Sequence, residues 1–170
     1  MEYVSIWDFY PDPDARNMTE CEYTVQRHRM NRSQLRNLKK RPHFREESIE
    51  LALEFGPDYI RASWEDTLED EGTTAEVDRY EVLEYWGILD ADLAETSGVE
   101  IPKELRKQDE IQVNIWICNS QILRLVLNPF TPRRIPYLSV PYELNPYSFF
   151  GIGVAENMAD TQLLLNGSMR

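Results

Sequence analysis

The feature that most constrains the fold is a hairpin pattern in the second half of the chain. Two runs rich in β-branched and apolar residues, 111–118 and 121–127, are separated only by Asn119 and Ser120. Strand-like runs joined by two turn-forming residues are typical of a tight antiparallel β-hairpin. One face of the first run carries aliphatic side chains at every second position: Ile111, Val113, Ile115 and Ile117. We therefore expect the chain to fold around an antiparallel sheet.

The rest of the chain alternates between strand and helix patterns. Period-two patterns predict further strands or extended segments over 3–9, 22–30, 80–88 and 137–140. Asn31 stands at a helix N-cap position with Gln34 as its capping-box partner, which predicts a short helix that ends before Pro42. Three more helices are expected: 49–55, which a strand pattern also fits, 91–98 and 153–170. These elements predict an α+β fold: an antiparallel sheet with several short helices and a C-terminal helix around one core.

Length and composition set the outer limits. At 170 residues and 42% hydrophobic, the chain can form one ordinary domain with its own core. No apolar run approaches the roughly 20 residues that cross a bilayer, so we expect a soluble, intracellular protein with no membrane partner. Cys21 and Cys118 lie far apart in sequence and outside any Cys-x-x-Cys, which indicates buried free thiols rather than a disulfide or a zinc site.

Charge is distributed unevenly along the chain. The net charge is −12, yet segment 27–45 holds eight Lys or Arg and no acid, while 61–100 holds thirteen acids against two Arg. Such asymmetry suits contact between unlike surfaces. The candidate contact residues are Arg27, Arg29, Arg32, Arg36, Lys39, Lys40 and Arg41. They would bind DNA phosphates without reading sequence, or meet the acidic loop of another subunit, with an ordinary solvated helix face as the alternative.

No catalytic residue, cofactor or metal site is predicted. Gly151 and Gly153 begin a Gly-x-Gly, but the third glycine of a dinucleotide fingerprint would fall at the position of Glu156. We interpret these two glycines as a hinge between an extended segment and a helix. The acids of the turn at 12–20 miss the spacing of a calcium loop, and neither histidine lies in a known catalytic spacing.

Several motifs, in order, resemble the portal (head-to-tail connector) proteins of tailed bacteriophages, particularly those of short-tailed phages. The first is SIWDFYPDPDARNMTECEYTVQRHRMNRSQLRNL, in which an Asp-Pro turn, an Arg-rich strand and a Met-x-Arg-Ser-x-Leu helix start follow one another. Next come EVLEYWGIL and the hairpin IWICNSQILRLVLNPF. The most specific is RIPYLSVPYELNPYSFFGIGVAENMADTQLLLN, which combines an extended segment, a Phe-Gly-x-Gly loop and a helix. The resemblance covers nearly the whole chain.

The resemblance implies a structural, non-enzymatic subunit of a usually dodecameric ring at one capsid vertex. Its implied partners are other copies of itself, the terminase, head-tail adaptor and capsid proteins, and double-stranded DNA that passes through the ring without sequence-specific contacts. The protein would lie in the virion, and in the host cytoplasm during assembly. No cofactor is implied.

Members of that family are several times longer, so residues 1–170 are expected to form a single wing-like α+β domain of a longer subunit. Within it, 58–79 would be an acidic loop and 153–170 the start of a helix that continues. The main alternative is a stand-alone nucleic-acid-binding module that uses the basic segment 27–45. A hydrolase or nuclease that uses the acidic loop ranks last.

Overall fold

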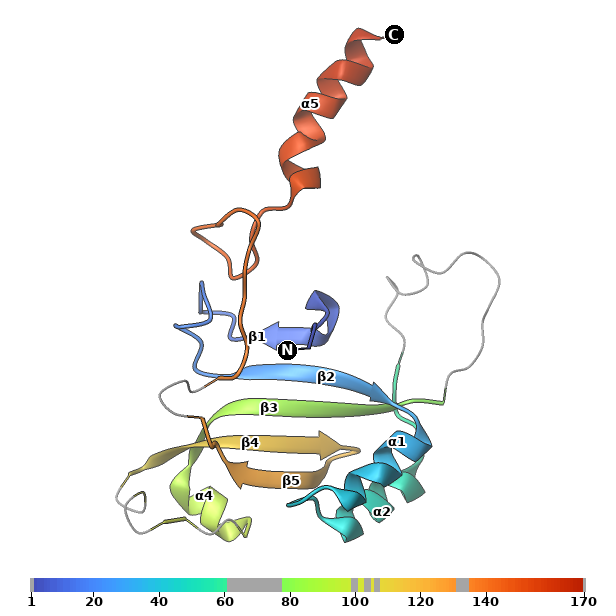
Figure 1. The fold of residues 1–170 in the computed structure, drawn as a ribbon, viewed down its shortest axis with the longest axis vertical. Coiled ribbons are helices and arrows are strands. Elements are labelled where there is room, and N and C mark those ends of the chain that lie inside the picture. The colour runs from blue at the N-terminus through green and yellow to red at the C-terminus, as the bar shows by residue number, and fades with distance from the viewer. Residues whose placement is uncertain are drawn as a thin grey trace.

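The structure is a computed structural model that describes residues 2–60, 78–98, 101–102, 105, 108–130 and 135–169. Among these residues, the centre of the fold is a five-stranded antiparallel sheet whose strands lie side by side in chain order (Figure 1). The strands are β1 Phe9–Pro11, β2 Thr24–Met30, β3 Tyr80–Asp90, β4 Glu110–Cys118 and β5 Gln121–Leu127. The predicted α+β fold is confirmed, and β1 and β5 are the two edges of its sheet.

The predicted hairpin is formed by β4 and β5. Asn119 and Ser120 have positive φ values of 49° and 60°, the conformation that a two-residue turn needs at both positions to match the twist of its strands. The Asn119 side chain also donates hydrogen bonds of 2.9 Å to the carbonyls of Ala52 and Gly56. These hydrogen bonds join the turn to the C-terminal end of a helix that packs on one face of the sheet.

Short helices cover opposite faces of the sheet. One face packs against α1 (Arg32–Asn37), the 3-10 turn η2 (Leu38–Lys40) and α2 (Glu46–Phe55), and α4 (Ala91–Thr96) packs against the other. The capping box predicted at the start of α1 is present, because Asn31 and Gln34 accept each other's backbone N–H. Asp90 caps α4, because its carboxylate accepts from the backbone N–H groups of Asp92 and Leu93.

Strand β4 buries side chains on both faces. Ile111 and Val113 belong to the core beneath α4, whereas Trp116 and Cys118 belong to the core beneath α1 and α2. The period-two pattern identified the first face correctly. The second face carries an aromatic residue, a cysteine and an asparagine, so its burial was not evident from hydrophobic alternation.

Strand β5 contains a β-bulge at Leu123. Ile122 lies opposite Ile117 and Arg124 lies opposite Trp116, so Leu123 is an extra residue with no partner on β4. Its side chain is completely buried in the core beneath α1 and α2, and its carbonyl accepts a 2.8 Å hydrogen bond from the N–H of Arg45. The bulge thus attaches the loop before α2 to the edge of the sheet.

A third cluster anchors the C-terminal part of the chain near β1. Ala15, Cys21 and Ile135 are buried there, with Tyr137 packed against them. The ring of Tyr137 meets Phe9 edge-on at 5.1 Å, and its hydroxyl donates a 2.7 Å hydrogen bond to the side chain of Gln26. Beyond Tyr137 the chain leaves the sheet as an extended segment and ends in α5 (Val154–Ser168), which projects away from the body (Figure 1).

The strand expected over 3–9 was wrong: Ile6–Asp8 form a 3-10 turn whose N-cap Ser5 accepts from the N–H of Trp7, and strand β1 starts only at Phe9. A local side-chain cap therefore prevailed over a strand-like composition. The acidic loop expected over 58–79 lies mostly outside the described residues.

Burial of Cys118 should make its thiol unreactive. The raised pKa of this thiol should also make the stability of the fold depend on pH. Loss of hydration raises the pKa of this thiol from 9.0 to about 12. Because the folded-state pKa exceeds the unfolded value, the resulting stability is present below pH 9 and is lost as the pH rises toward 12. In alkaline titrations monitored by circular dichroism, we expect Cys118→Val to show a shallower loss of unfolding free energy. Identical slopes for the two proteins would contradict the assignment.

Candidate interaction surfaces

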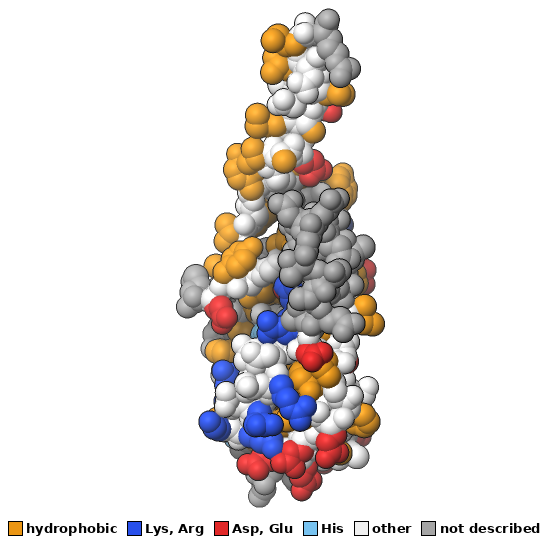
Figure 2. All heavy atoms as spheres, turned by 90° about the vertical axis from the view of Figure 1, so that its right-hand side faces the viewer, with side chains coloured by type: hydrophobic (Ala, Val, Ile, Leu, Met, Phe, Trp, Pro, Cys, Tyr) orange, Lys and Arg blue, Asp and Glu red, His pale blue; other side chains and the backbone are white. Residues whose placement is uncertain are grey.

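A basic corner is formed by four exposed side chains on and after α1. They are Arg32, Arg36, Lys40 and Arg41. Within the described residues, no carboxylate forms an ion pair with any of them. Figure 2 shows Lys and Arg side chains gathered over the lower part of the molecule, directly above a group of acidic side chains. This corner has the exposure and charge that phosphate or carboxylate contacts require.

The other candidate basic residues have partners within the chain. Asp8 binds both arginines of β2, with 2.9 Å between its carboxylate oxygens and the Nη2 atoms of Arg27 and Arg29. Burial opposes the charge on Arg27, but the hydrogen bond to Asp8 and the electrostatic effects of Tyr10, Tyr59 and Asp8 together outweigh it and raise the pKa of its guanidinium. Lys39 pairs with Glu50 and thereby lowers the pKa of that carboxyl. Of the predicted contact residues, Arg27, Arg29 and Lys39 are therefore paired with carboxylates of the same chain. The others form the basic corner.

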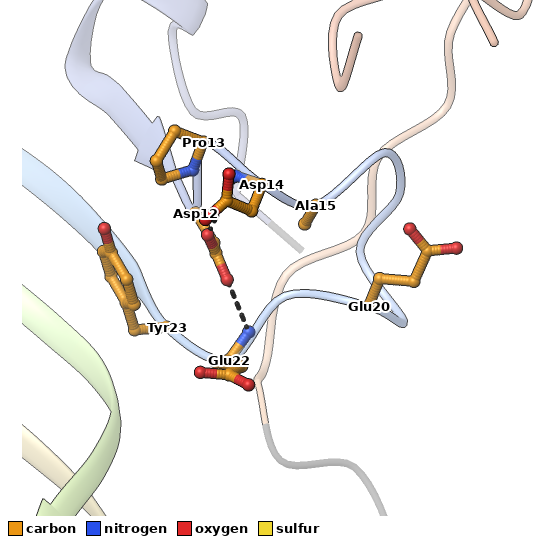
Figure 3. Close-up of a pocket in the computed structure, with 7 residues that line it drawn as sticks. All are labelled: Asp12, Pro13, Asp14, Ala15, Glu20, Glu22 and Tyr23. Atoms are coloured by element: carbon orange, nitrogen blue, oxygen red, sulfur yellow. Dashed lines mark hydrogen bonds between the residues drawn. The ribbon is translucent and has the colours of Figure 1, made fainter. Parts of the chain in front are cut away.

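The acidic turn between β1 and β2 surrounds a hollow of about 290 Å³ (Figure 3). Asp12 is buried, and its carboxylate accepts from the N–H groups of Asp14 at 3.0 Å and Glu22 at 3.2 Å. Its role is to fix the turn. Glu20 points away from Asp12 in Figure 3, and no group of three or more His, Cys, Asp or Glu among the described residues could hold a metal ion.

Glu84 is the centre of a polar network beneath the α1–α2 side of the sheet. Its Oε1 accepts from Trp86 Nε1 at 2.9 Å and from Asn114 Nδ2 at 3.1 Å, and its Oε2 lies 2.9 Å from Nε2 of His28. The His28 ring also stacks on Trp116 with 4.9 Å between ring centroids. The sequence did not reveal this network, because its members come from three strands and meet only through the sheet register.

The two glycines interpreted as a hinge have different surroundings. A side chain on Gly151 would collide with the carbonyl of Glu143 and would come within 2.5 Å of Pro141 Cβ. Nothing lies within 4 Å of the corresponding point on Gly153, whose φ of −88° suits any residue. Gly151 therefore allows two backbone segments to approach closely, whereas Gly153 is the N-cap of α5.

This difference predicts unequal effects of two alanine substitutions. Gly151→Ala should separate the two segments and break the 2.9 Å hydrogen bond from the N–H of Ile152 to the carbonyl of Glu143. Gly153→Ala should leave that bond intact. In hydrogen-exchange measurements, we expect the Ile152 amide to exchange about fivefold faster in Gly151→Ala, for the loss of about 1 kcal/mol. Equal exchange rates in the two variants would contradict this account.

A groove of about 560 Å³ runs beside the outer edge of β5. Its walls are His43, Gly98, the β5 residues Arg124, Leu125, Val126 and Leu127, and Pro129. His43 has a positive φ of 66°, which is uncommon for a residue with a side chain. The guanidinium of Arg124 lies 5.4 Å from the centroid of the Phe44 ring, a cation–π distance. The groove thus lies beside the outer edge of β5, where Phe44 is bridged to Arg124.

No helix among the described residues has the length and apolar character to cross a membrane. The sequence matches a family model described as the phage SU10 portal protein over residues 1–169. No curated protein matches the chain.

Proposed function

The chain belongs to the phage SU10 portal protein family, and we propose that it serves in the portal ring as part of the DNA conduit and of the platform on which terminase and tail or adaptor proteins dock. The family has a structural role in phage particles. The observation that carries the proposal is the match over residues 1–169, which includes the sheet, the basic corner and the projecting helix.

The proposed ring needs surfaces of unlike character on each subunit. A ring forms when one surface binds a different surface of the next copy and the rotation closes. The basic corner, the acidic turn at Asp12–Glu22 and the projecting C-terminal segment lie on different elements of one chain. These features support heterologous association, with the basic corner contacting either DNA phosphates or an acidic surface of another protein.

Mass spectrometry of purified virions tests the proposed location. In particles of the phage that encodes this chain, we expect its peptides at a fixed ratio of about one ring per capsid, far below the major capsid protein. Absence from intact virions, or a ratio that varies between preparations, would contradict a portal role.

The basic corner gives a prediction about DNA. Arg36→Glu should weaken binding to duplex DNA and make the slope of log K against log salt less negative by about 1, because one phosphate contact is lost. Arg16→Glu makes the same charge change on an exposed residue of the β1–β2 turn and is the matched control. Equal effects of the two variants would favour a general charge effect. A stand-alone nucleic-acid-binding module would bind DNA in this way but be absent from virions.

A further inference from the structure

The groove beside β5 combines basic and apolar walls. Arg124 and His43 bring basic side chains to it, and no acidic residue is among the described residues that line it. Four apolar residues form most of the remaining wall: Leu125, Val126, Leu127 and Pro129. Its volume of about 560 Å³ lies within the range of roughly 300–1,000 Å³ that is typical of ligand sites. Such walls suit an anionic group that is joined to apolar ones.

The Arg124 side chain is held in place by the loop before α2. Phe44 is bridged to Arg124, and the N–H of Arg45 donates to the carbonyl of Leu123 at 2.8 Å. That loop therefore occupies the sheet edge at this point, so a ligand here would contact side chains rather than extend the sheet. Phe44 is buried, and the Arg124 guanidinium lies 5.4 Å from the centroid of its ring. Contact with a buried ring positions the guanidinium before any ligand binds.

Arg124 lacks the carboxylate partner that the arginines of β2 have. Asp8 binds Arg27 and Arg29, and the pKa of each of these guanidinium groups is raised. Within the described residues, no carboxylate forms an ion pair with Arg124. The Nε atom of Arg124 is buried without a hydrogen-bond acceptor. A buried donor without an acceptor costs free energy, and an incoming anion would recover it.

The charges around Arg124 favour an anion from outside the chain. Loss of hydration lowers the pKa of its guanidinium; the charge of Glu84 opposes this effect, and the charge of Arg41 adds to it. The Glu84 carboxylate is already bound in the polar network of the sheet. An anion beside Arg124 would therefore relieve the repulsion between two guanidinium groups.

The apolar wall determines which kind of anion fits. From Arg124 to Leu127 the strand covers about 10 Å, the length of a short extended peptide. Inorganic phosphate can reach the guanidinium but leaves the apolar wall in water, and a nucleic-acid backbone also presents charged and polar groups. A carboxylate matches the planar guanidinium, and neighbouring aliphatic side chains match the wall. A peptide with an acidic residue between apolar residues would use both features.

We propose that this groove binds an extended segment of a partner protein in which a glutamate or aspartate lies between apolar residues. The carboxylate accepts hydrogen bonds from the Arg124 guanidinium, and the apolar side chains lie against Val126 and Leu127. The basic end fixes the position of the segment, and the apolar wall adds affinity. The proposal does not rest on the portal function, because the groove is formed by this chain alone.

Nuclear magnetic resonance titrations with two blocked peptides test the proposal. The probe is acetyl-Leu-Glu-Leu-amide, and acetyl-Leu-Gln-Leu-amide is a control of nearly the same shape without the charge. We expect the glutamate peptide to shift the Nε–H signal of Arg124 and the amide signals of Val126 and Leu127. It should bind about tenfold more tightly than the glutamine peptide. Inorganic phosphate, the third probe, should bind more weakly because it does not contact the apolar wall.

Substitutions of Arg124 locate the binding. Arg124→Gln should weaken binding of the glutamate peptide about tenfold and abolish its advantage over the glutamine peptide. Arg16→Gln removes the same charge from the exposed β1–β2 turn and should leave both affinities unchanged. Arg124→Lys keeps the charge but loses the planar guanidinium, so its affinity should be intermediate. If Arg124→Gln does not fold, the two peptides on the unmodified chain still decide the question.

Four results would overturn the proposal. They are no signal change at millimolar peptide, equal affinity for the two peptides, equal effects of Arg124→Gln and Arg16→Gln, and phosphate binding as tight as that of the glutamate peptide. The last result would show an oxyanion site without a peptide site. A chain that prefers the glutamate peptide but is absent from virions would contradict the portal function and support this site.

Discussion

Replacing Glu84 by alanine should lower the free energy of unfolding by about 3–5 kcal/mol. The Glu84 side chain is only 12% exposed, and its carboxylate is bound by donors from Trp86, Asn114 and His28. Removal of the carboxylate leaves these polar groups without their acceptor in a buried setting, and each unsatisfied group costs about 1–3 kcal/mol. Urea unfolding monitored by tryptophan fluorescence measures the loss.

Two further variants separate this network from general effects of charge and size. Glu84→Gln keeps the shape but places an amide N–H₂ among donors, so we expect a loss smaller than that of alanine. Glu54→Ala removes the same side chain from an exposed position of α2 and should change stability by less than about 0.5 kcal/mol. If Glu84→Ala were no more harmful than Glu54→Ala, the network would not stabilise the sheet.

Leu123→Ala should cost about 3 kcal/mol, within the range of 2–5 kcal/mol found for large-to-small substitutions in cores. Leu123 is fully buried at the β-bulge of β5 and packs in the cluster that joins the sheet to α1 and α2. Loss of its side chain removes apolar contact and leaves a cavity where the sheet edge meets the helices. Thermal unfolding by calorimetry would show a lower transition midpoint.

The matched control for this substitution is Leu51→Ala. Leu51 is 45% exposed on α2, so its loss should cost less than about 1 kcal/mol. Similar costs at the two positions would mean that the bulge does not place Leu123 in the core. A normal midpoint for Leu123→Ala would contradict the packing described above.

Features set by local chemistry could be predicted from the sequence. The dipeptide Asn119-Ser120 tolerates positive φ and gave the hairpin, and Asn31 with Gln34 gave the start of α1. Side-chain caps and two-residue turns act over three or four residues. Their signals are therefore complete in a short stretch of sequence.

Features that depend on sheet register could not be predicted. The bulge at Leu123 leaves no mark in composition, and Glu84 meets His28 and Asn114 only because β2, β3 and β4 align with one particular offset. The same limit applied to the basic segment. Arg27 alternates onto the face that carries Asp8, 19 residues earlier, whereas Arg36 projects from a helix into solvent.

The hydrogen bond between Ile152 and Glu143 closes a small loop, residues 144–151, at the foot of α5. Because α5 makes no buried contact among the described residues, tension along this helix reaches the sheet through the loop. If this bond and the hydrogen bond from the Asn157 side chain to the Glu143 carboxylate both open, eight residues can straighten and lengthen the connection by about 25 Å. The folded loop is therefore a reserve of chain length. α5 can move by that distance before the connecting segment pulls on Tyr137, which packs against Phe9.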